Sequence, residues 1–307
     1  MKSRKRGAFL GLAVGDALGA AIEFQVPGEF EPVTGYRGGG PWGLEPGEWT
    51  DDTTMALALA DSINTVGWCL EDQAQRYVLW MEEGEYSVNG RCFDIGCQTR
   101  EALWAFQQTG DARTSGPTDS KKSGNGSIMR LAPAAIHAAG HFPHDIPQLA
   151  RIAAESSLPT HGGHQCVSAC QYMALIMAGL FAGLDKHEVL DSEWKPLAEL
   201  RESVDLHWRI KKIAGGSFRD KEPPEIRGTG WVVESLEAAL WAFCQASDFR
   251  EAVLGAVNLG NDADTTGAVC GQLAGACWGE TGIPAEWLDG LARREEMIDP
   301  IVDHLTN

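Results

Sequence analysis

The chain has 307 residues, of which 44% are hydrophobic and 22% are charged, as in ordinary soluble globular proteins. Its formal net charge of -18 argues against a nucleic-acid partner, because a nucleic-acid-binding surface needs a basic patch, and against an anionic membrane as partner. A length of 307 residues is near the limit of a single hydrophobic core, and no segment resembles a linker. We therefore expect one domain over residues 1–307.

Helical patterns dominate the chain, because apolar residues recur at helical spacing and no run has the composition of a strand. The predicted helices, in chain order, are 7–24, 53–66, 70–82, 97–108, 128–139, 145–156, 163–183, 231–246, 248–258 and 265–278. The sequence therefore predicts an all-α fold, a single-domain orthogonal helical bundle. Small residues fill 7–21, 55–60 and 267–277, and they allow helix backbones to approach closely, so we expect these segments at the centre.

The N-terminus has basic residues ahead of the apolar stretch 7–15, which is a pattern shared with signal peptides. The stretch continues without a break through Asp16 to Phe24, so we expect a core helix that carries polar groups. The eight cysteines form no CxxC pair and show no zinc-ligand spacing. A chain of this length needs no disulfides, so a reducing, cytoplasmic location is expected.

Two acidic segments far apart in the chain are nearly alike. Residues 50–54 read Thr-Asp-Asp-Thr-Thr, residues 262–266 read Asp-Ala-Asp-Thr-Thr, and each precedes a predicted helix. Hard divalent cations such as Mg²⁺ require oxygen ligands, so the two segments together would form a site for one or two ions. Asp and Thr are also preferred N-cap residues, and one such cluster alone is more typical of a cap. Two clusters, each with two carboxylates, exceed what capping requires.

Other polar positions have two interpretations each. Glu23 ends the first predicted helix, and Asp16 lies seven residues earlier on nearly the same face, where either could be a ligand, a surface charge or a cap. The segment 124–127, Gly-Asn-Gly-Ser, directly precedes the helix predicted from 128 and could bind a phosphate through free backbone N–H groups, or could be an ordinary turn. His161 and Asp94 also lie beside predicted helix starts, where a structural role is equally compatible with the pattern.

The order of these motifs resembles that of the ADP-ribosylglycohydrolase family, which includes the dinitrogenase reductase-activating glycohydrolases. The matching segments are 11–19 with Glu23, 49–53, 94–96, 124–130, 160–161 and 261–265, and the resemblance extends from about residue 7 to 278. It implies an all-α fold with two divalent cations, Mg²⁺ or Mn²⁺, at the bottom of a cleft. The metal ligands that it implies are Glu23, Thr50, Asp51, Asp52, Asp262, Asp264 and Thr265.

The resemblance also implies the residues that bind and cleave the substrate. Gly124, Asn125, Gly126 and Ser127 would cradle the diphosphate and the adjoining ribose of ADP-ribose, and His161 would contact the ligand. The metals would orient the substrate and lower the pKa of the attacking water, which a carboxylate such as Asp51, Asp52 or Glu23 would help to hold. Asp94 matches a position that, in arginine-specific bacterial members, faces the scissile ribose and the guanidinium leaving group.

The expected function is therefore hydrolysis of the bond between ADP-ribose and a protein side chain, with release of ADP-ribose. The Asp94 motif favours arginine as that side chain. One alternative is the same scaffold acting on ADP-ribose linked to serine, to a small molecule or to nucleic acid. Another is a non-catalytic member, a crystallin-like protein or an ADP-ribose binder, but the intact ligand set argues against it. Without the resemblance, a metal-dependent phosphohydrolase would fit the same motifs.

Overall fold

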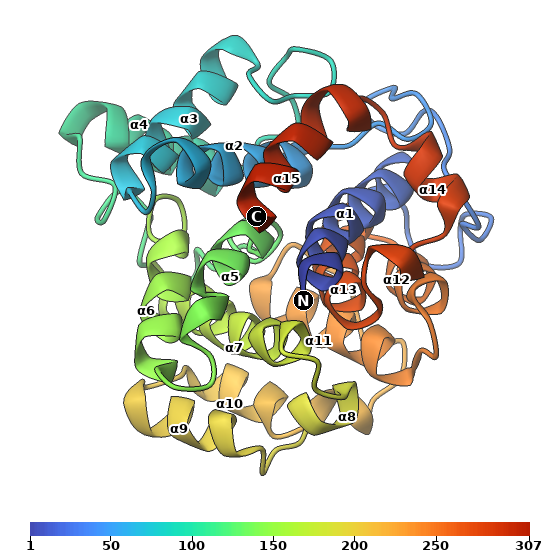
Figure 1. Ribbon diagram of the computed structural model, residues 1–307. Helices are drawn as coiled ribbons and strands as arrows, with labels where there is room; N and C mark the ends of the chain where they lie inside the picture. Colours follow the sequence, from blue (N-terminus) through green and yellow to red (C-terminus); the bar gives the residue numbers. More distant parts are fainter.

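Helices run through the whole chain in the computed structural model, which describes residues 1–307 (Figure 1). The predicted all-α fold is confirmed, because the only β pairing consists of two isolated bridges, Gly39 with Leu44 and Gly124 with Trp231. The α-helices are α1 Lys2–Gly19, α2 Asp51–Val66, α3 Leu70–Glu83, α4 Cys97–Thr109, α5 Ala132–Ala138, α6 Ile146–Ser157, α7 His164–Phe181, α8 Lys186–Val189, α9 Lys195–Ser203, α10 Trp208–Ala214, α11 Val232–Gln245, α12 Phe249–Val257, α13 Ala263–Trp278, α14 Ala285–Gly290 and α15 Asp299–Thr306. Short turns of other helix types are η1 Ala20–Ile22, η2 Ala139–His141, η3 Ser217–Arg219, η4 Glu280–Gly282 and η5 Arg294–Ile298.

Helices α1 and α13 lie side by side at the centre, in antiparallel contact (Figure 1). Glycines face each other along this contact, and a Cβ added at Gly271 would lie only 2.0 Å from the carbonyl oxygen of Gly11. One turn further along, a Cβ at Gly15 would lie 2.1 Å from the oxygen of Gly267. The prediction that the small-residue segments form the central helices is confirmed for this pair. Their contact brings the end of α1 beside the start of α13.

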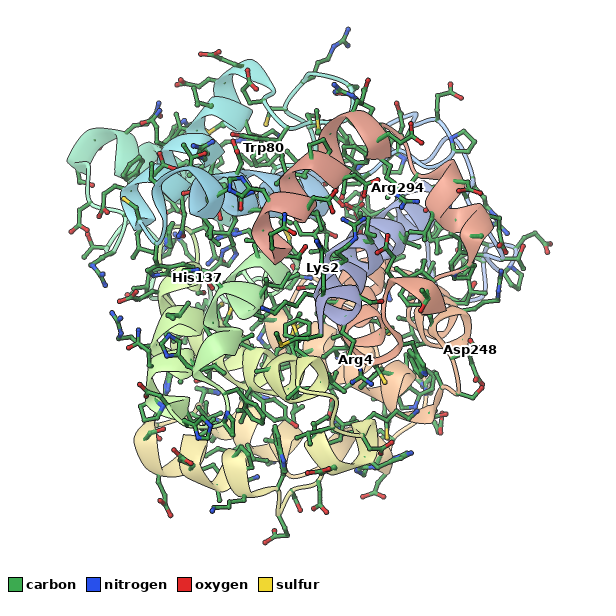
Figure 2. The ribbon with its side chains drawn as sticks, in the orientation of Figure 1. Lys2, Arg4, Trp80, His137, Asp248 and Arg294 are labelled. Atoms are coloured by element: carbon green, nitrogen blue, oxygen red, sulfur yellow. The ribbon has the colours of Figure 1, made fainter.

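Side chains fill the space between the helices (Figure 2) and form a large core. A cluster of 87 buried hydrophobic residues extends from Ala8 to Val302, and a second, of 3 residues, comprises Ile226, Ala238 and Leu259. Helices α2 to α4 lie at one edge of the molecule, and α8 to α10 lie at another (Figure 1). All eight cysteines are free. None of the helices combines the length and apolar character that crossing a bilayer requires.

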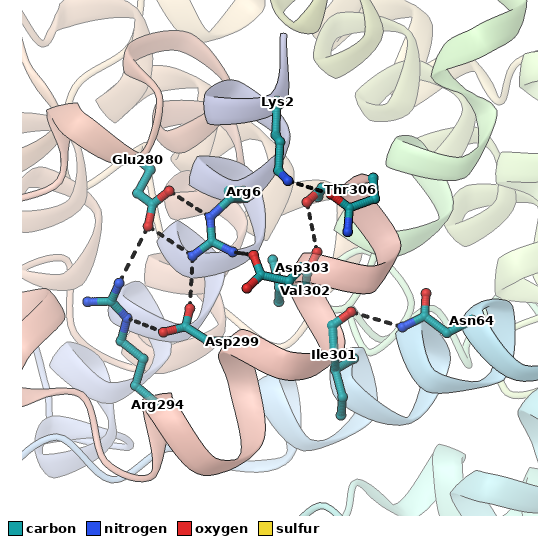
Figure 3. Close-up of polar contacts among 11 residues, drawn as sticks. Lys2, Arg6, Asn64, Glu280, Arg294, Asp299, Ile301, Val302, Asp303 and Thr306 are labelled. Atoms are coloured by element: carbon teal, nitrogen blue, oxygen red, sulfur yellow. Dashed lines mark hydrogen bonds and ion pairs between the residues drawn. The ribbon is translucent and has the colours of Figure 1, made fainter.

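Ion pairs tie the first helix to the C-terminal segment (Figure 3). Arg6 donates from Nε to Glu280 Oε2 at 2.7 Å and from Nη2 to Asp299 Oδ1 at 2.9 Å, and it also pairs with Asp303. Arg294 pairs with Asp299 at 3.1 Å. The Arg6 side chain is only 12% exposed, so this network closes over the outer end of α1 and covers the central helix contact.

The helix predicted over 128–139 is shorter in the structure, because α5 begins only at Ala132. A single helical turn occupies the intervening residues, in which the Met129 N–H donates to Asn125 O at 3.2 Å. Pro133 has no N–H to donate to Met129 O, so the turn cannot continue into α5 with regular helical hydrogen bonds, and Gln272 Nε2 donates to Met129 O at 2.8 Å instead. The glycine loop is therefore followed by one turn and not directly by α5.

Candidate functional site

The first acidic cluster lies at the start of α2, but its threonine does not cap the helix. The Thr50 side chain accepts no capping bond; instead Thr50 N–H and Oγ1–H both donate to Asp16 Oδ1 at 2.9 Å. Thr53 N–H and Oγ1–H donate to Asp16 Oδ2 at 3.0 and 2.6 Å. The buried Asp16 carboxylate of α1 thus takes the role of the cap, which leaves the Asp51 and Asp52 carboxylates free for other partners.

The second acidic cluster lies at the start of α13, directly beside the first. Asp262 is the N-cap residue of α13, yet its side chain makes no capping bond. Thr50 Oγ1 lies 3.4 Å from Asp264 Oδ2, and Thr265 Oγ1 lies 3.3 Å from Asp52 Oδ1. The two segments therefore interlock through their hydroxyl and carboxylate groups, and capping does not account for either of them.

The carboxylates form two groups that could hold metal ions. Oxygens of Asp16, Asp52 and Asp264 lie within 4.8 Å of one another, and so do oxygens of Glu23, Asp262 and Asp264. Asp264 belongs to both groups. Asp52 Oδ2 is buried and has no hydrogen-bond partner, whereas both Asp16 oxygens already accept two hydrogen bonds each. The orphaned Asp52 oxygen and the all-oxygen donor set fit a hard divalent cation.

Crowding of these carboxylates changes their acidity. Burial raises the pKa of Asp51, Asp52 and Asp264 well above the ordinary value, and the negative charges of neighbouring carboxylates raise it further. Burial likewise raises the pKa of Glu23 to about 7, against the opposing effect of its hydrogen bond from Trp42. Bringing these carboxylates together therefore disfavours their charged form. A bound cation would remove the free-energy cost of keeping them charged.

Left-handed backbone occurs in three of the four segments that supply the cleft with carboxylates, the segment of Asp51 being the exception. Phe24, Asp94 and Asn261 are non-glycine residues with left-handed φ values of 64°, 58° and 55°. Each of them is, or directly adjoins, a predicted site residue. Phe24 N–H donates to Asn261 O, and Asn261 N–H donates to Gln25 O at 2.7 Å, so the two chain segments clamp each other. Strain of this kind persists where the surrounding structure imposes it, and it concentrates at functional sites.

The glycine loop forms one wall of the cleft and is bonded to the acidic floor. Asn125 Nδ2 donates to Asp262 Oδ2 at 2.7 Å, and Asn125 N–H donates to Gly230 O at 3.0 Å. Gly126 must be glycine, because an added Cβ would lie 2.7 Å from His161 Cε1. Ser127 is buried behind the loop, where its Oγ accepts from the Cys170 thiol at 3.4 Å, and it does not line the cleft.

His161 supports the loop from below as a buried, neutral imidazole. Burial and then the charge of Arg130 lower the pKa of His161 to about 3. His161 Nδ1 lies 2.8 Å from Thr160 Oγ1, which accepts a hydrogen bond from Arg130 Nη2 at 2.6 Å. Arg130 also donates to Gly126 O at 2.6 Å and lies over the ring of Tyr77 at 4.6 Å. The chain from Arg130 through Thr160 to His161 thus fixes the glycine loop from inside the core.

The structure gathers most of the predicted site residues around one cleft of about 600 Å³. Those that line it are Glu23, Asp51, Asp94, Gly124, Asn125, Gly126, His161, Asp262, Asp264 and Thr265. Thr50 and Asp52 are buried beneath this surface, Asp51 lies outside both carboxylate groups, and Ser127 lies behind the wall. Asp94 also lines the cleft and lies close to Glu23; burial, followed by the charges of Asp51 and Glu23, raises the pKa of its carboxyl to about 11.

Several side chains at the cleft were not predicted from the sequence, and Trp42 and Gln98 are two of them that bond to predicted site residues. Trp42 donates from Nε1 to Glu23 Oε2 at 2.7 Å, and Gln98 Oε1 accepts from the Gly124 N–H at 3.2 Å. No local pattern identifies either partner, because both contacts join segments that are separated along the chain. A loop tryptophan between glycines was the one available signal for Trp42, since an aromatic ring at a loop tip often contacts a ligand or a site residue.

Comparisons with known proteins identify the family of this chain. The family model of ADP-ribosylglycohydrolase matches residues 1–307. ADP-ribosylarginine hydrolase Tri1 of Pseudomonas putida (strain GB-1) is 41% identical over 290 residues, which are 94% of this chain and 74% of that protein. ADP-ribosyl-(dinitrogen reductase) glycohydrolase of Rhodospirillum rubrum is 32% identical over 298 residues, which are 95% of this chain and 92% of that protein.

A solved structure described as an ADP-ribosylglycohydrolase-related protein complex superimposes with a TM-score of 0.85 and 41% sequence identity. The match covers 99% of this chain and 97% of that chain. The named relatives are hydrolases, and the likeness extends over the whole molecule and not only over the acidic segments. By sequence and by structure, this chain belongs to the ADP-ribosylglycohydrolase family.

Proposed function

We propose that this protein is a divalent-metal-dependent hydrolase that cleaves the N-glycosidic bond between ADP-ribose and an arginine side chain. The observation that carries the proposal is the meeting of carboxylates from three distant segments, around Glu23, Asp51 and Asp262, in one cleft whose wall is the Gly124 loop. Two relatives near 40% identity bear the name ADP-ribosylarginine hydrolase, which favours arginine over other linkages.

Two divalent cations, Mg²⁺ or Mn²⁺, would be held at the two carboxylate groups, which have Asp264 in common. The residues that would hold them are Glu23, Thr50, Asp51, Asp52, Asp262, Asp264 and Thr265. Bound cations would orient the ribose hydroxyls and lower the pKa of the attacking water. Asp16 is the positioning residue of this set, because its oxygens are occupied by Thr50 and Thr53.

The glycine loop is suited to the diphosphate of ADP-ribose. Its backbone lines the cleft at Gly124 and Gly126. The Gly124 N–H donates to Gln98 Oε1 and is not free for a phosphate, and Gly126 packs directly against the His161 ring. Asn125 donates to Asp262, so the loop and the carboxylate floor keep a fixed relative position. An ADP-ribose that spans the two would present its distal ribose to the carboxylates.

Asp94 would act on the leaving group. It lines the cleft close to Glu23, and its raised pKa reflects burial and the charges of neighbouring carboxylates. Positive charge develops on the ribose as the glycosidic bond breaks, and the carboxylates of Asp51 and Glu23 would stabilise it. Asp94 is placed to orient the guanidinium or to give a proton to the departing guanidine.

The test is release of free ADP-ribose from peptides that carry it on arginine or on serine, and from ADP-ribosylated nucleic acid, each with and without EDTA. We expect turnover on arginine that EDTA abolishes. Replacing Asp51 or Asp52 with Asn should reduce metal affinity and turnover by at least about 100-fold, because a ligand change exceeds the 10–100-fold effect of altering a group behind it. Asp220→Asn, at an exposed aspartate outside the cleft, is the matched control.

Arginine hydrolysis that persists at full rate in EDTA would exclude the metal-dependent mechanism. Turnover on serine- or nucleic-acid-linked ADP-ribose alone would exclude the arginine linkage. Binding of ADP-ribose without turnover of any of the three substrates would identify a binding protein.

A further inference from the structure

The cleft continues past Asp94 into a second cavity of about 650 Å³. Asp94 and Phe24 line both spaces, so the two cavities join at the candidate catalytic carboxyl. The character of the lining changes at this junction. The main cleft is lined chiefly by polar groups and glycines, whereas the second cavity presents Trp42, Phe93, Met81 and Ile95.

Trp42 is held rigidly although its side chain is 38% exposed. It lies at the tip of a turn closed by two hydrogen bonds, Gly39 N–H to Leu44 O at 2.7 Å and Leu44 N–H to Gly39 O at 3.0 Å. The turn rests on η1, since a Cβ added at Gly40 would lie 2.8 Å from Ala21 Cα. A fixed aromatic side chain that is not covered by the protein's own core is available to a ligand.

The Trp42 and Phe93 rings form the aromatic part of this cavity, with their centroids 5.9 Å apart and their planes at 51°. The Trp42 indole is bonded to Glu23, and Asp94 lies next to Phe93 in the chain, so both rings stand directly beside carboxylates. A planar cation placed here would meet ring faces and carboxyl oxygens together. Arg100 is the one basic residue of the lining, and Glu23, Asp51 and Asp94 outnumber it at the junction.

We propose that the second cavity holds the arginine side chain that carries ADP-ribose, with the guanidinium against the Trp42 and Phe93 rings and beside Asp94. The inference rests on the proposed function and adds a specificity determinant to it. ADP-ribose occupies the main cleft, the scissile bond lies at Asp94, and the leaving group lies beyond it. A serine leaving group has neither the charge nor the plane that these rings recognise, so the aromatic pair selects the arginine linkage.

Phe93 is the residue to test, because Trp42 also orients Glu23 and its replacement would disturb both functions. Phe93→Ala removes the ring, and Phe93→Leu keeps apolar bulk without a π face. Trp104→Ala is the matched control, since Trp104 is a 54% exposed aromatic residue on α4 that lines neither cavity. The readouts are kcat/KM on arginine- and serine-linked ADP-ribosyl peptides, and the Kd for free ADP-ribose by calorimetry.

We expect both Phe93 variants to lower kcat/KM on the arginine-linked peptide by about tenfold, which is the scale of a desolvated cation–π contact. The Kd for ADP-ribose should be unchanged, because the product leaves this cavity empty, and Trp104→Ala should match the wild type in both measurements. Phe93→Leu retains the packing volume, and its circular dichroism and melting temperature verify that the fold is intact.

Wild-type kcat/KM in the two Phe93 variants would overturn the inference. Weaker binding of ADP-ribose that accounts for the whole loss would also overturn it, because the cavity would then hold part of ADP-ribose itself. A wild-type enzyme that does not cleave the arginine-linked peptide would instead overturn the proposed function, a result that needs no Phe93 variant to detect.

Discussion

Asp16 illustrates how a single side chain can organise a site without joining its chemistry. It comes from α1, yet it accepts four hydrogen bonds from the first turn of α2. By satisfying the Thr50 and Thr53 N–H groups, it leaves the carboxylates of Asp51, on the cleft surface, and Asp52, buried beneath it, free for other partners. The pattern of residues in the sequence left Asp16 as a ligand, a surface charge or a cap, and the structure shows a cap that acts on a different helix.

Replacing Asp16 with Asn should destabilise the metal-bound protein by about 1–3 kcal/mol. One carboxylate oxygen becomes an NH₂ group, so a buried N–H of Thr50 or Thr53 loses its acceptor. Urea unfolding in saturating Mn²⁺ measures the change. Metal must be present, because in its absence removal of a crowded negative charge would offset part of the loss.

The control for Asp16 is Asp248→Asn. Asp248 is an exposed N-cap residue that accepts from Glu251 N–H at 2.8 Å, and its loss should cost no more than about 1 kcal/mol. If the two variants lost the same free energy of unfolding, burial of the Asp16 carboxylate would add nothing to the stability beyond that of an exposed cap.

The residues of the two acidic segments could be predicted from the sequence, because the segments contain more carboxylates than capping requires. The order of the motifs along the chain also matches that of a known family. Trp42 could not be predicted as a partner of Glu23, since that contact depends on the path of a loop without regular structure. The same holds for Gln98, which reaches the glycine loop from α4. Local patterns identify residues with ligand chemistry, but they do not identify the long-range contacts that fix those residues in place.

At the scale of elements, the contact between α1 and α13 sets the geometry of the site. The glycines allow the two backbones to touch, so the end of α1 and the start of α13 are held at a fixed separation. Asp16 lies near the end of α1, and Asp264 lies at the start of α13. Any increase in the spacing of the helices would separate the carboxylates that the proposed metal site requires.

Gly271→Ala should therefore destabilise the protein by about 1–3 kcal/mol or more and weaken metal binding, because its Cβ would lie 2.0 Å from Gly11 O and the helices would have to separate. Gly255→Ala in α12 is the control. Its Cβ would meet only the Ala242 Cβ at 3.6 Å, so the helix should gain about 0.5–1 kcal/mol. Urea unfolding and Mn²⁺ titration of both variants test the prediction, which an unaltered Gly271→Ala protein would contradict.

The ten helices predicted from apolar spacing all occur, although the one predicted over 128–139 is reduced to the seven residues of α5. The helices that were not predicted are α8, α9, α10, α14 and α15. The longest of these, α9, has nine residues, and proline or polar residues interrupt their apolar spacing. Such short helices depend on tertiary packing, and their apolar pattern is too short for the helix to be recognised from the sequence.

At the scale of the whole molecule, the site concentrates negative charge inside a protein that already carries a net charge of -18. The folded state raises the pKa of Asp16 to about 6 and that of Glu23 to about 7, mainly through burial. Between the ordinary carboxyl pKa near 4 and these values, the folded protein binds more protons than the unfolded chain. The stabilisation due to these groups is complete below the ordinary pKa and is lost as the pH rises through 6 and 7.

Metal should reverse this dependence, because ligands bind cations in their deprotonated form and affinity rises with pH. We expect the increase in Tm on adding Mn²⁺ to EDTA-treated protein to be larger at pH 8 than at pH 6. Differential scanning calorimetry at the two pH values measures it, and comparing each sample with its own EDTA reference removes the contribution of other titrating groups. An equal increase at both pH values would contradict the proposed proton competition.

The contact between α1 and α13 also determines when, during synthesis, the site can form. During synthesis, α1 leaves the ribosome first, but the glycine face that it needs lies on α13, more than 200 residues later. Until then its close-packing surface has no native partner, and a contact of such high sequence separation forms late and slowly. A nascent chain that ends before Asp262 would possess Asp51, Asp94 and the glycine loop but no complete site. Hydrolytic activity should therefore arise only when nearly the whole chain has been made.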